Sequence, residues 1–377
     1  MLPALKTDRA SLADVMPACL AALSGSPNRL GLPAVSRAIV LLVDGLGAAS
    51  LSARAGHART LVGRMTAASV IESGFPTTTA SALATLTTGV PSGQHGLVGY
   101  SVLDPENDRV LKQLSGWDDR VDPAVWQPMP TIFEQAVDAG FTAVVIGPER
   151  YRDSGFTAAV LRGATYLGAA TIADRLERAA AWLREPGPAG IAYVYVPELD
   201  STGHADGSES GAWTAWLETL DAAVATLVGS LRPKDGLLVT ADHGVVDIPE
   251  HAHVLVDEIP GLLDGVRHIA GEPRCLQLHL EPGADADAVI ERWRAAEDSR
   301  SWVVSREEAI AAGWFGPVRA EVIPRIGDII VAARKNIAYY DGRVTGNTGR
   351  SMVGQHGSWS PAELRVPLLR YGAFANQ

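Results

Sequence analysis

Hydrophobic and polar positions along this chain follow two alternating patterns. Short, continuous hydrophobic runs, typical of strands buried on both faces of a parallel sheet, lie at 37–43, 142–146, 190–196 and 236–240. Longer segments with hydrophobic positions every three or four residues, typical of amphipathic helices, lie at 11–24, 131–139, 173–184 and 211–231. Further strands are expected at 65–72 and 365–369. The alternation predicts an α/β fold with a doubly wound, mostly parallel central sheet and helices on both faces.

The pattern changes between residues 255 and 345. The segments expected there are strands at 275–280, 302–305 and 327–333 and a helix at 285–295. Short strands around a single helix indicate a small α+β insertion rather than more strand–helix pairs. We therefore expect residues 1–254 and 346–377 to form one core, with 255–345 inserted as a small lid beside the site.

Residues 74–89 read Gly-Phe-Pro-Thr-Thr-Thr-Ala-Ser-Ala-Leu-Ala-Thr-Leu-Thr-Thr-Gly and predict a helix. Pro76 is compatible with a first helical turn, where its missing N–H would be unpaired anyway, and Gly89 is a typical helix end. Hydroxyls at the start of this helix would lie among free backbone N–H groups, which favour anions. Because a threonine hydroxyl is a weak nucleophile, it needs a base or a metal ion nearby.

Composition narrows the class of protein. The chain of 377 residues is 47% hydrophobic and 20% charged, which is globular composition. A net charge of −11 without a basic stripe argues against binding to a nucleic-acid backbone. No apolar run is long enough for a membrane span, and the first residues lack a secretory pattern, so we expect a cytoplasmic protein. The two cysteines, Cys19 and Cys275, form neither a CxxC pair nor a disulfide framework.

Aspartate and histidine residues gather near the ends of the predicted strands. They are Asp44, Asp200, His204, Asp242, His243 and His356. The carboxyl ends of parallel strands meet at one edge of a sheet, so these side chains can converge although they are distant in sequence. Three aspartates and three histidines with one threonine suit two divalent metal ions that share a nucleophile.

Each of these residues alone also has a simpler interpretation. Asp44 fits a turn residue that caps a helix, and Asp200 with His204 fits a capped helix start with a surface histidine. His356 alone fits a structural histidine. The segment after residue 43 also partly matches a dinucleotide-binding fingerprint, but Ser50 stands where a third glycine or alanine belongs. The combination, in this order and near strand ends, favours one shared site.

Five segments together resemble the alkaline phosphatase superfamily, and within it the nucleotide pyrophosphatase/phosphodiesterase (type I phosphodiesterase) branch. They are Val43-Asp-Gly45, Phe75-Pro-Thr-Thr-Thr79 with Thr88-Gly89 and Gln94-His-Gly96, Asp200-Ser-Thr-Gly-His204, Asp242-His-Gly244 and Gly354-Gln-His-Gly357. The resemblance covers residues from about 37 to 258 and again from about 325 to the end. The residues between carry none of it.

This resemblance implies that Thr79 is the nucleophile, with Thr77 and Thr78 as alternatives because adjacent threonines blur the register. The implied ligands are Asp44, Thr79, Asp242 and His243 for one metal ion and Asp200, His204 and His356 for the other. The family usually holds zinc at both places, although mixed aspartate and histidine ligation also suits Mn²⁺ or Fe²⁺.

The implied function is hydrolysis of phosphodiester or pyrophosphate bonds in a small, nucleotide-like substrate through a phosphothreonine intermediate. A phosphomonoesterase or phosphonate hydrolase with the same two metals is the alternative. Monoester cleavage typically needs an arginine around three free oxygens, and the threonine helix carries none. A metal-stabilised binding protein without activity is a third interpretation, which the complete ligand set argues against. Expected partners are a small phosphate ester and two metal ions, without nucleic acid or membrane; the sequence leaves the oligomeric state open.

Overall fold

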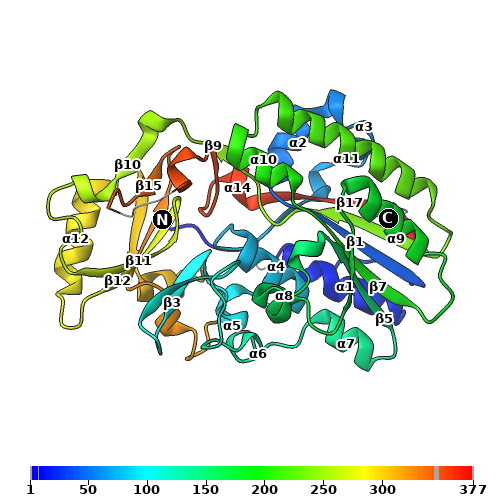
Figure 1. The fold of residues 1–377 in the computed structure, drawn as a ribbon, viewed down its shortest axis with the longest axis horizontal. Helices are drawn as coiled ribbons and strands as arrows, with labels where there is room; N and C mark the ends of the chain where they lie inside the picture. Colours follow the sequence, from blue (N-terminus) through cyan, green and yellow to red (C-terminus); the bar gives the residue numbers. More distant parts are fainter. Residues whose placement is uncertain (1, 7, 344–347, 376–377) are drawn as a thin grey trace.

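Figure 1 shows the computed structural model, which describes residues 2–6, 8–343 and 348–375. Its central sheet has seven strands: β1 (Arg37–Val43), β2 (Val70–Glu72), β5 (Thr142–Gly147), β6 (Thr165–Gly168), β7 (Gly190–Val196), β8 (Asp235–Thr240) and β17 (Arg365–Gly372). Their order is β2-β17-β8-β1-β7-β5-β6. The five strands from β8 to β6 are parallel to one another. β17 is antiparallel to both of its neighbours, β8 and β2. The predicted mostly parallel α/β sheet is confirmed.

Helices cover both faces of this sheet (Figure 1). One layer contains α1 (Val15–Leu23), α4 (Thr79–Thr88), α7 (Ile132–Asp138) and α8 (Gly155–Val160). The other contains α3 (Arg59–Val62), α9 (Ile172–Trp182) and α11 (Gly211–Gly229). The shorter core elements are α2 (Ala48–Ala53), α5 (Ser92–His95), α6 (Pro123–Trp126), α10 (Glu198–Asp206), α14 (Pro361–Leu364), β3 (Ser101–Asp104) and β4 (Arg109–Lys112).

Local sequence explains these layers. All seven residues of β1 are buried, as expected for a strand covered by helices on both faces. Helix α9 begins at a capping box, in which Thr171 and Asp174 satisfy each other's backbone N–H groups. Its buried residues, which include Ile172 and Leu176, recur at helical spacing and face β5 and β7. Apolar runs thus form the sheet, and amphipathic segments cover it.

The expected strand at 65–72 is wrong over most of its length. Only Val70–Glu72 is a strand, because Thr66 and Ser69 cap a turn of 3₁₀ helix immediately before it. The strand lies at the sheet edge and pairs with only three residues of β17. In contrast, the expected last strand continues to Gly372 because β17 also pairs with β8.

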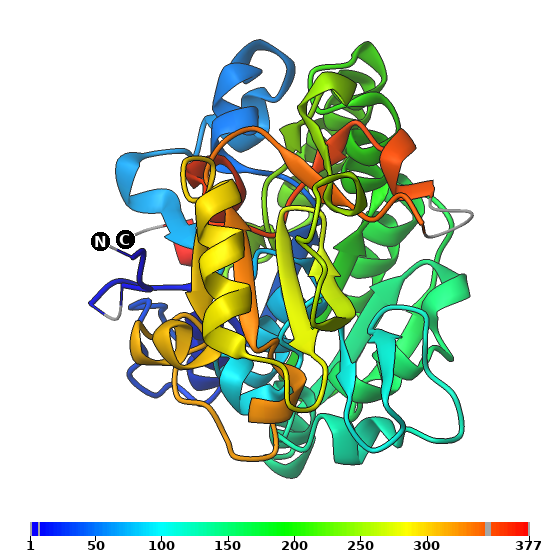
Figure 2. The ribbon, with the colours of Figure 1, turned by 90° about the vertical axis from the view of Figure 1, so that its left-hand side faces the viewer.

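A second, four-stranded antiparallel sheet forms the yellow and orange part of the molecule (Figure 2). Its strands, in the order β11-β12-β14-β13, are β11 (Val266–Glu272), β12 (Cys275–Leu280), β14 (Ile329–Ala333) and β13 (Ser301–Ser305). Helix α12 (Ala286–Glu297) packs on one face, where Leu278 and Val331 join Trp293 in a separate hydrophobic cluster. Alternate residues, such as Cys275 and Ile330, join the main core. Because successive side chains of a strand face opposite sides, one face of the small sheet packs with α12 and the other packs against the core of the large sheet.

Short strands connect the remaining segments. β9 (Val246–Asp247) pairs with β16 (Gly354–Gln355), and β10 (His253–Leu255) pairs with β15 (Ala338–Tyr340). α13 (Arg306–Ala311) follows β13. The expected end of the insertion at 345 and restart of the core at 346 lie outside the described residues, and the domain division stays a prediction. Both cysteines are buried, and no helix in the described ranges is long and apolar enough to cross a membrane.

Candidate metal centre

Two buried carboxylates follow neighbouring strands of the central sheet. Asp44 comes directly after β1, and Asp242 lies two residues beyond β8. Their exposed fractions are 2% and 0%. Oδ1 of Asp242 accepts hydrogen bonds from the backbone N–H groups of Gly45 at 3.1 Å and His243 at 2.9 Å. These bonds join the two strand ends and leave Oδ2 of Asp242 3.4 Å from Nε2 of His243.

Glycine allows these strand ends to approach their neighbours. Gly45 has a φ of +73°, and a Cβ there would lie 3.0 Å from Cα of Asp200. A Cβ at Gly244 would lie 2.0 Å from the backbone oxygen of Ala362. A larger residue at either position would therefore push α10 or the C-terminal segment away from the site.

Asp200 and His204 lie one turn apart on α10, the helix after β7, and so share a helix face. Nε2 of His204 is 3.4 Å from Oδ2 of Asp200, and its Nδ1 is 2.7 Å from the backbone oxygen of Gly354. Because a carbonyl oxygen can only accept, Nδ1 carries the hydrogen in this contact. The lone pair of Nε2 is then directed to the carboxylate side, which is the arrangement of a metal-binding imidazole.

His356 reaches the site from the C-terminal part of the chain. The antiparallel pairing of β16 with β9 brings its loop to the segment that follows His243. The two imidazole rings stack with their centroids 3.6 Å apart. Nδ1 of His356 is 2.8 Å from the backbone oxygen of Thr77, and its Nε2 is 3.9 Å from Oδ1 of Asp200. The contact at Nδ1 thus orients the ring, with Nε2 on the side of Asp200.

The predicted nucleophile is the first residue of α4. Thr79 is buried and follows Thr78, the extended residue at which the helix is capped. Oγ1 of Thr79 is 3.2 Å from Nε2 of His243. The hydroxyl therefore lies both at the positive end of a helix and beside the imidazoles, as the sequence predicts.

The segment before α4 corrects one expectation. Pro76 does not lie in a first helical turn, because α4 begins only at Thr79. The hydroxyl of Thr77 donates to the backbone oxygen of Ser358 at 2.7 Å and accepts from the N–H of Gly357 at 3.1 Å. These bonds hold the preceding segment against the His356 loop rather than in a helix. The helix ends as predicted, at a left-handed glycine with φ of +74°.

Three carboxyl groups are crowded at the centre of the site. One carboxylate oxygen each of Asp44, Asp200 and Asp242 is buried and has no hydrogen-bond partner in the described part of the chain. Burial raises the pKa of Asp44 well above its ordinary value, and the other two carboxylates raise it further. Burial also raises the pKa of Asp242 to about 7. Burial and two neighbouring imidazoles lower the pKa of His356.

The residues present fit divalent metal ions. Two overlapping sets have ligand atoms within 4.8 Å of one another: Asp200, His204 and His356, and Asp44, Asp200 and His243. The first set equals the predicted ligands of the second metal ion. Asp242 adjoins the other set through His243. Cations would satisfy the unpartnered oxygens and offset their repulsion. Oxygen and nitrogen donors suit Zn²⁺, Mn²⁺ or Fe²⁺, and the ligand roles stay predictions.

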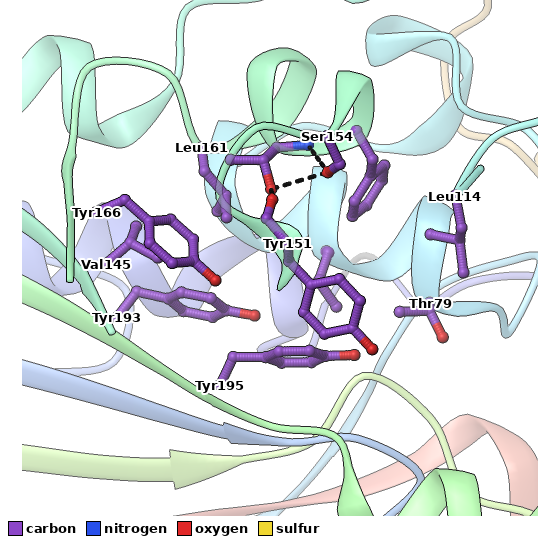
Figure 3. A pocket seen from close by; sticks show the side chains of 12 residues that line it. Thr79, Leu114, Val145, Tyr151, Ser154, Leu161, Tyr166, Tyr193 and Tyr195 are labelled. Atoms are coloured by element: carbon purple, nitrogen blue, oxygen red, sulfur yellow. Dashed lines mark hydrogen bonds between the residues drawn. The ribbon is translucent and has the colours of Figure 1, made fainter. Parts of the chain in front are cut away.

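A cavity of about 90 Å³ opens beside Thr79 (Figure 3). We call it the tyrosine pocket, because the rings of Tyr151, Tyr166, Tyr193 and Tyr195 line it together with apolar side chains. In Figure 3 the Tyr193 and Tyr195 side chains lie one behind the other along β7, and Thr79 lies at the end nearer Tyr151 and Tyr195. An organic group held among these rings would adjoin the Thr79 hydroxyl.

The tyrosine pocket was not predicted from the sequence, although the strand at 190–196 carries a signal for it. Tyr193 and Tyr195 are two residues apart, so they face the same side of a strand. They also lie near its carboxyl end, where α/β sheets bind ligands. Trp126 and Trp314 are buried in the hydrophobic core and do not line this pocket.

A buried carboxyl of the small sheet lies behind the start of α4. Glu272, the last residue of β11, is 5% exposed, and its Oε2 accepts from the N–H of Tyr100 at 2.8 Å. A Cβ at Gly357 would lie 2.3 Å from its Cγ, so the side chain also packs against the His356 loop. Burial raises the pKa of Glu272 to about 8, against the opposing effect of bonds from Tyr100 and Thr78.

Buried aspartates and histidines at the carboxyl ends of a mostly parallel sheet, beside a hydroxyl at a helix start, define a candidate metal-dependent hydrolase site on an α/β fold. The model of the type I phosphodiesterase/nucleotide pyrophosphatase family matches residues 38–359. The chain therefore belongs to this family, which lies in the alkaline phosphatase superfamily. No curated protein sequence matches the chain significantly.

Solved structures share the fold. Murine ectonucleotide pyrophosphatase/phosphodiesterase 5 has a TM-score of 0.71 at 18% identity, over 89% of this chain and 88% of that one. An inactive threonine-to-alanine variant of the murine protein, in complex with AMP, has a TM-score of 0.70 at 18% identity, with the same coverage. Phosphonoacetate hydrolase from Sinorhizobium meliloti, in complex with phosphonoacetate, has a TM-score of 0.69 at 18% identity, over 90% and 91%.

The family supports a phosphodiesterase or pyrophosphatase, and the structural relatives show that the fold is shared. A small phosphoester substrate is consistent with the family. The family is typically dependent on divalent metal ions, and the structure contains the two candidate ligand sets described above.

Proposed function

We propose that this protein is a metal-dependent phosphodiesterase or pyrophosphatase that acts on a small, nucleotide-like substrate through a phosphothreonine at Thr79. The observation that carries the proposal is a set of three buried carboxylate oxygens, from Asp44, Asp200 and Asp242, that have no hydrogen-bond partner among the described residues. They lie beside His243, whose Nε2 is 3.2 Å from Oγ1 of Thr79. Such a cluster is costly without cations. Two zinc ions are the proposed occupants, with Mn²⁺ or Fe²⁺ as alternatives.

The proposed ligands divide into two groups. They are Asp44, Asp242, His243 and Thr79 for one ion and Asp200, His204 and His356 for the other. When bound, the ions would supply positive charge that lowers the pKa of a hydroxyl and stabilises anionic phosphoryl and leaving oxygens. The bonds from Nδ1 of His204 and of His356 to backbone oxygens keep both rings in the orientation that this role requires.

Thr79 is the nucleophile in this proposal. The hydroxyl loses its proton and its oxygen forms a bond to phosphorus while the bond from phosphorus to the leaving oxygen breaks. The leaving oxygen gains a proton, giving a phosphothreonine ester and a free alcohol or phosphate. Water then attacks the same phosphorus, breaks its bond to Thr79 and releases the second product. Thr77 is less suited because its hydroxyl already donates to the Ser358 backbone. The N–H groups at the start of α4 adjoin the reacting oxygens.

The tyrosine pocket supports a substrate with an organic group on phosphorus. Its aromatic and apolar walls suit a ring, and its position beside Thr79 would hold that ring close to the reacting bond. No arginine or lysine lines the pocket in the described residues, so it offers aromatic and apolar contacts to an organic group rather than a charge.

Hydrolysis assays with three substrates test the proposal. Zinc-loaded protein is expected to cleave bis(p-nitrophenyl) phosphate at least about tenfold faster than p-nitrophenyl phosphate, and a chelator should abolish both activities. Preference for the monoester or for phosphonoacetate would instead support the alternative, a phosphomonoesterase or phosphonate hydrolase with the same metals. Turnover that is unaffected by complete metal removal would contradict the metal-dependent mechanism.

A further inference from the structure

We propose that the Tyr195 hydroxyl is a positioning group for Asp44: it fixes the carboxylate so that only Oδ1 faces the metal site. The ring of the same residue forms a wall of the tyrosine pocket. Tyr195 thereby links the pocket to the ligand set formed by Asp44, Asp200 and His243. This role presupposes the metal-dependent function proposed above and adds a residue to its machinery.

The backbone places the two residues together. In the parallel pairing of β1 with β7, Val43 lies opposite Val196, and the N–H of Asp44 donates to the backbone oxygen of Val196 at 2.9 Å. Asp44 is therefore anchored to the end of the strand that carries Tyr195. The Tyr195 hydroxyl donates to Oδ2 of Asp44 across this pairing.

The hydroxyl leaves the two oxygens of Asp44 in different environments. Oδ2 accepts from Tyr195, whereas Oδ1 is buried, has no hydrogen-bond partner in the described residues and lies 3.5 Å from Nε2 of His243. A carboxylate without this donor could rotate and exchange its oxygens. Outer groups that hydrogen-bond a ligating carboxylate typically change metal affinity by about 10–100-fold when removed.

Tyr193 provides an internal comparison. It lies two residues earlier on β7, lines the same pocket, and its ring is 6.3 Å from that of Tyr195 at an interplanar angle of 16°. Its hydroxyl is also buried but has no hydrogen-bond partner in the part of the chain described. Tyr193→Phe and Tyr195→Phe therefore remove the same atom from the same wall, but only the second removes a contact with Asp44.

The test measures zinc binding by the metal-stripped protein, in competition with a chromogenic chelator, for wild type, Tyr193→Phe and Tyr195→Phe. Melting temperatures without metal establish that each variant folds. We expect Tyr195→Phe to weaken one of two zinc-binding steps by about 10–100-fold, whereas Tyr193→Phe stays within about threefold of wild type. With saturating zinc, Tyr195→Phe should lower kcat for bis(p-nitrophenyl) phosphate more than it raises KM, because the ring remains.

Three results would overturn this role. If Tyr195→Phe binds zinc as tightly as the wild type does, the hydroxyl does not contribute to metal binding. Equal weakening by both variants, or of both binding steps, would indicate a general change of the pocket wall instead. Failure of wild-type protein to bind zinc, Mn²⁺ or Fe²⁺ would overturn the proposed function itself, and the role of Tyr195 with it.

Discussion

At the scale of single residues, the site depends on polar groups that are buried before any metal ion is bound. Asp44, Asp200 and Asp242 each keep one oxygen without a hydrogen-bond partner among the residues that the structure describes, although such buried atoms in folded proteins are usually hydrogen-bonded. Backbone contacts orient the imidazoles of His204 and His356 around them. Stability is thus reduced locally at the place where charge is needed for chemistry.

Glu272 gives a residue-scale prediction on pH. Its pKa is raised from 4.5 to about 8, so between these values the folded protein binds more protons than the unfolded chain. Its contribution to the free energy of unfolding is therefore greatest below about pH 4.5 and falls as pH rises to about 8, by a few kcal/mol at most. Glutamine does not ionise, so Glu272→Gln should not lose this contribution to the free energy of unfolding. The variant should therefore become progressively more stable than the wild type as the pH rises toward 9.

Melting temperatures between pH 5 and 9, measured on metal-stripped protein, check this prediction. Glu281→Gln, at an exposed position just after β12, is the matched control and should follow wild type. Parallel curves for wild type and Glu272→Gln over the whole range would show that the buried carboxyl does not titrate as described.

At the scale of elements, a buried ion pair joins the small sheet to the loop that carries His356. Arg274, between β11 and β12, donates to both carboxylate oxygens of Glu363 in α14, at 2.7 and 2.8 Å. Both side chains are fully buried. Oε1 of Glu363 also accepts from the N–H of Ser358, two residues after His356. The pair therefore couples the position of this loop to the second sheet.

Removing one partner should leave the other charge buried and unpaired. We expect Arg274→Met to lower the free energy of unfolding by about 3–5 kcal/mol, and the double variant with Glu363→Leu to recover much of this loss. Urea unfolding measures both. Arg120→Met, which removes an exposed pair with Asp118, is the control and should have little effect. A similarly small effect of Arg274→Met would mean that the buried pair is not a strong link.

The elements also show where sequence reasoning succeeds. Apolar runs such as 190–196 identified the parallel strands because burial on both faces leaves a continuous hydrophobic pattern. The short pairings of β9 with β16 and of β3 with β4 were not predicted. A strand of two to four residues is too short to show the alternation of hydrophobic and polar positions that identifies a strand. The start of α4 was misplaced because Thr77 and its partners in the His356 loop lie about 280 residues apart, and such contacts leave no local signal.

At the scale of the whole molecule, the parallel sheet brings distant residues together. β8, β1 and β7 are neighbours, so the segments after them deliver Asp242, Asp44 and Asp200 to one edge. The order of the strands cannot be predicted from the local hydrophobic pattern. The position of a residue just after a parallel strand can be, and such residues meet at the carboxyl edge of the sheet. The cluster of ligand residues was therefore predictable. The tyrosine pocket was not, because its walls come from four separate segments. The zinc identity and cytoplasmic location stay predictions.

The most direct test of the central claim compares wild type with Thr79→Ala, both loaded with zinc, on bis(p-nitrophenyl) phosphate. Metal content and melting temperature are measured on the same samples, and Thr78→Ala is the neighbouring control. We predict that Thr79→Ala keeps its metal and its fold but loses at least about a thousandfold in rate, whereas Thr78→Ala retains most activity. A near wild-type rate for metal-loaded Thr79→Ala would contradict the proposal that this hydroxyl attacks phosphorus.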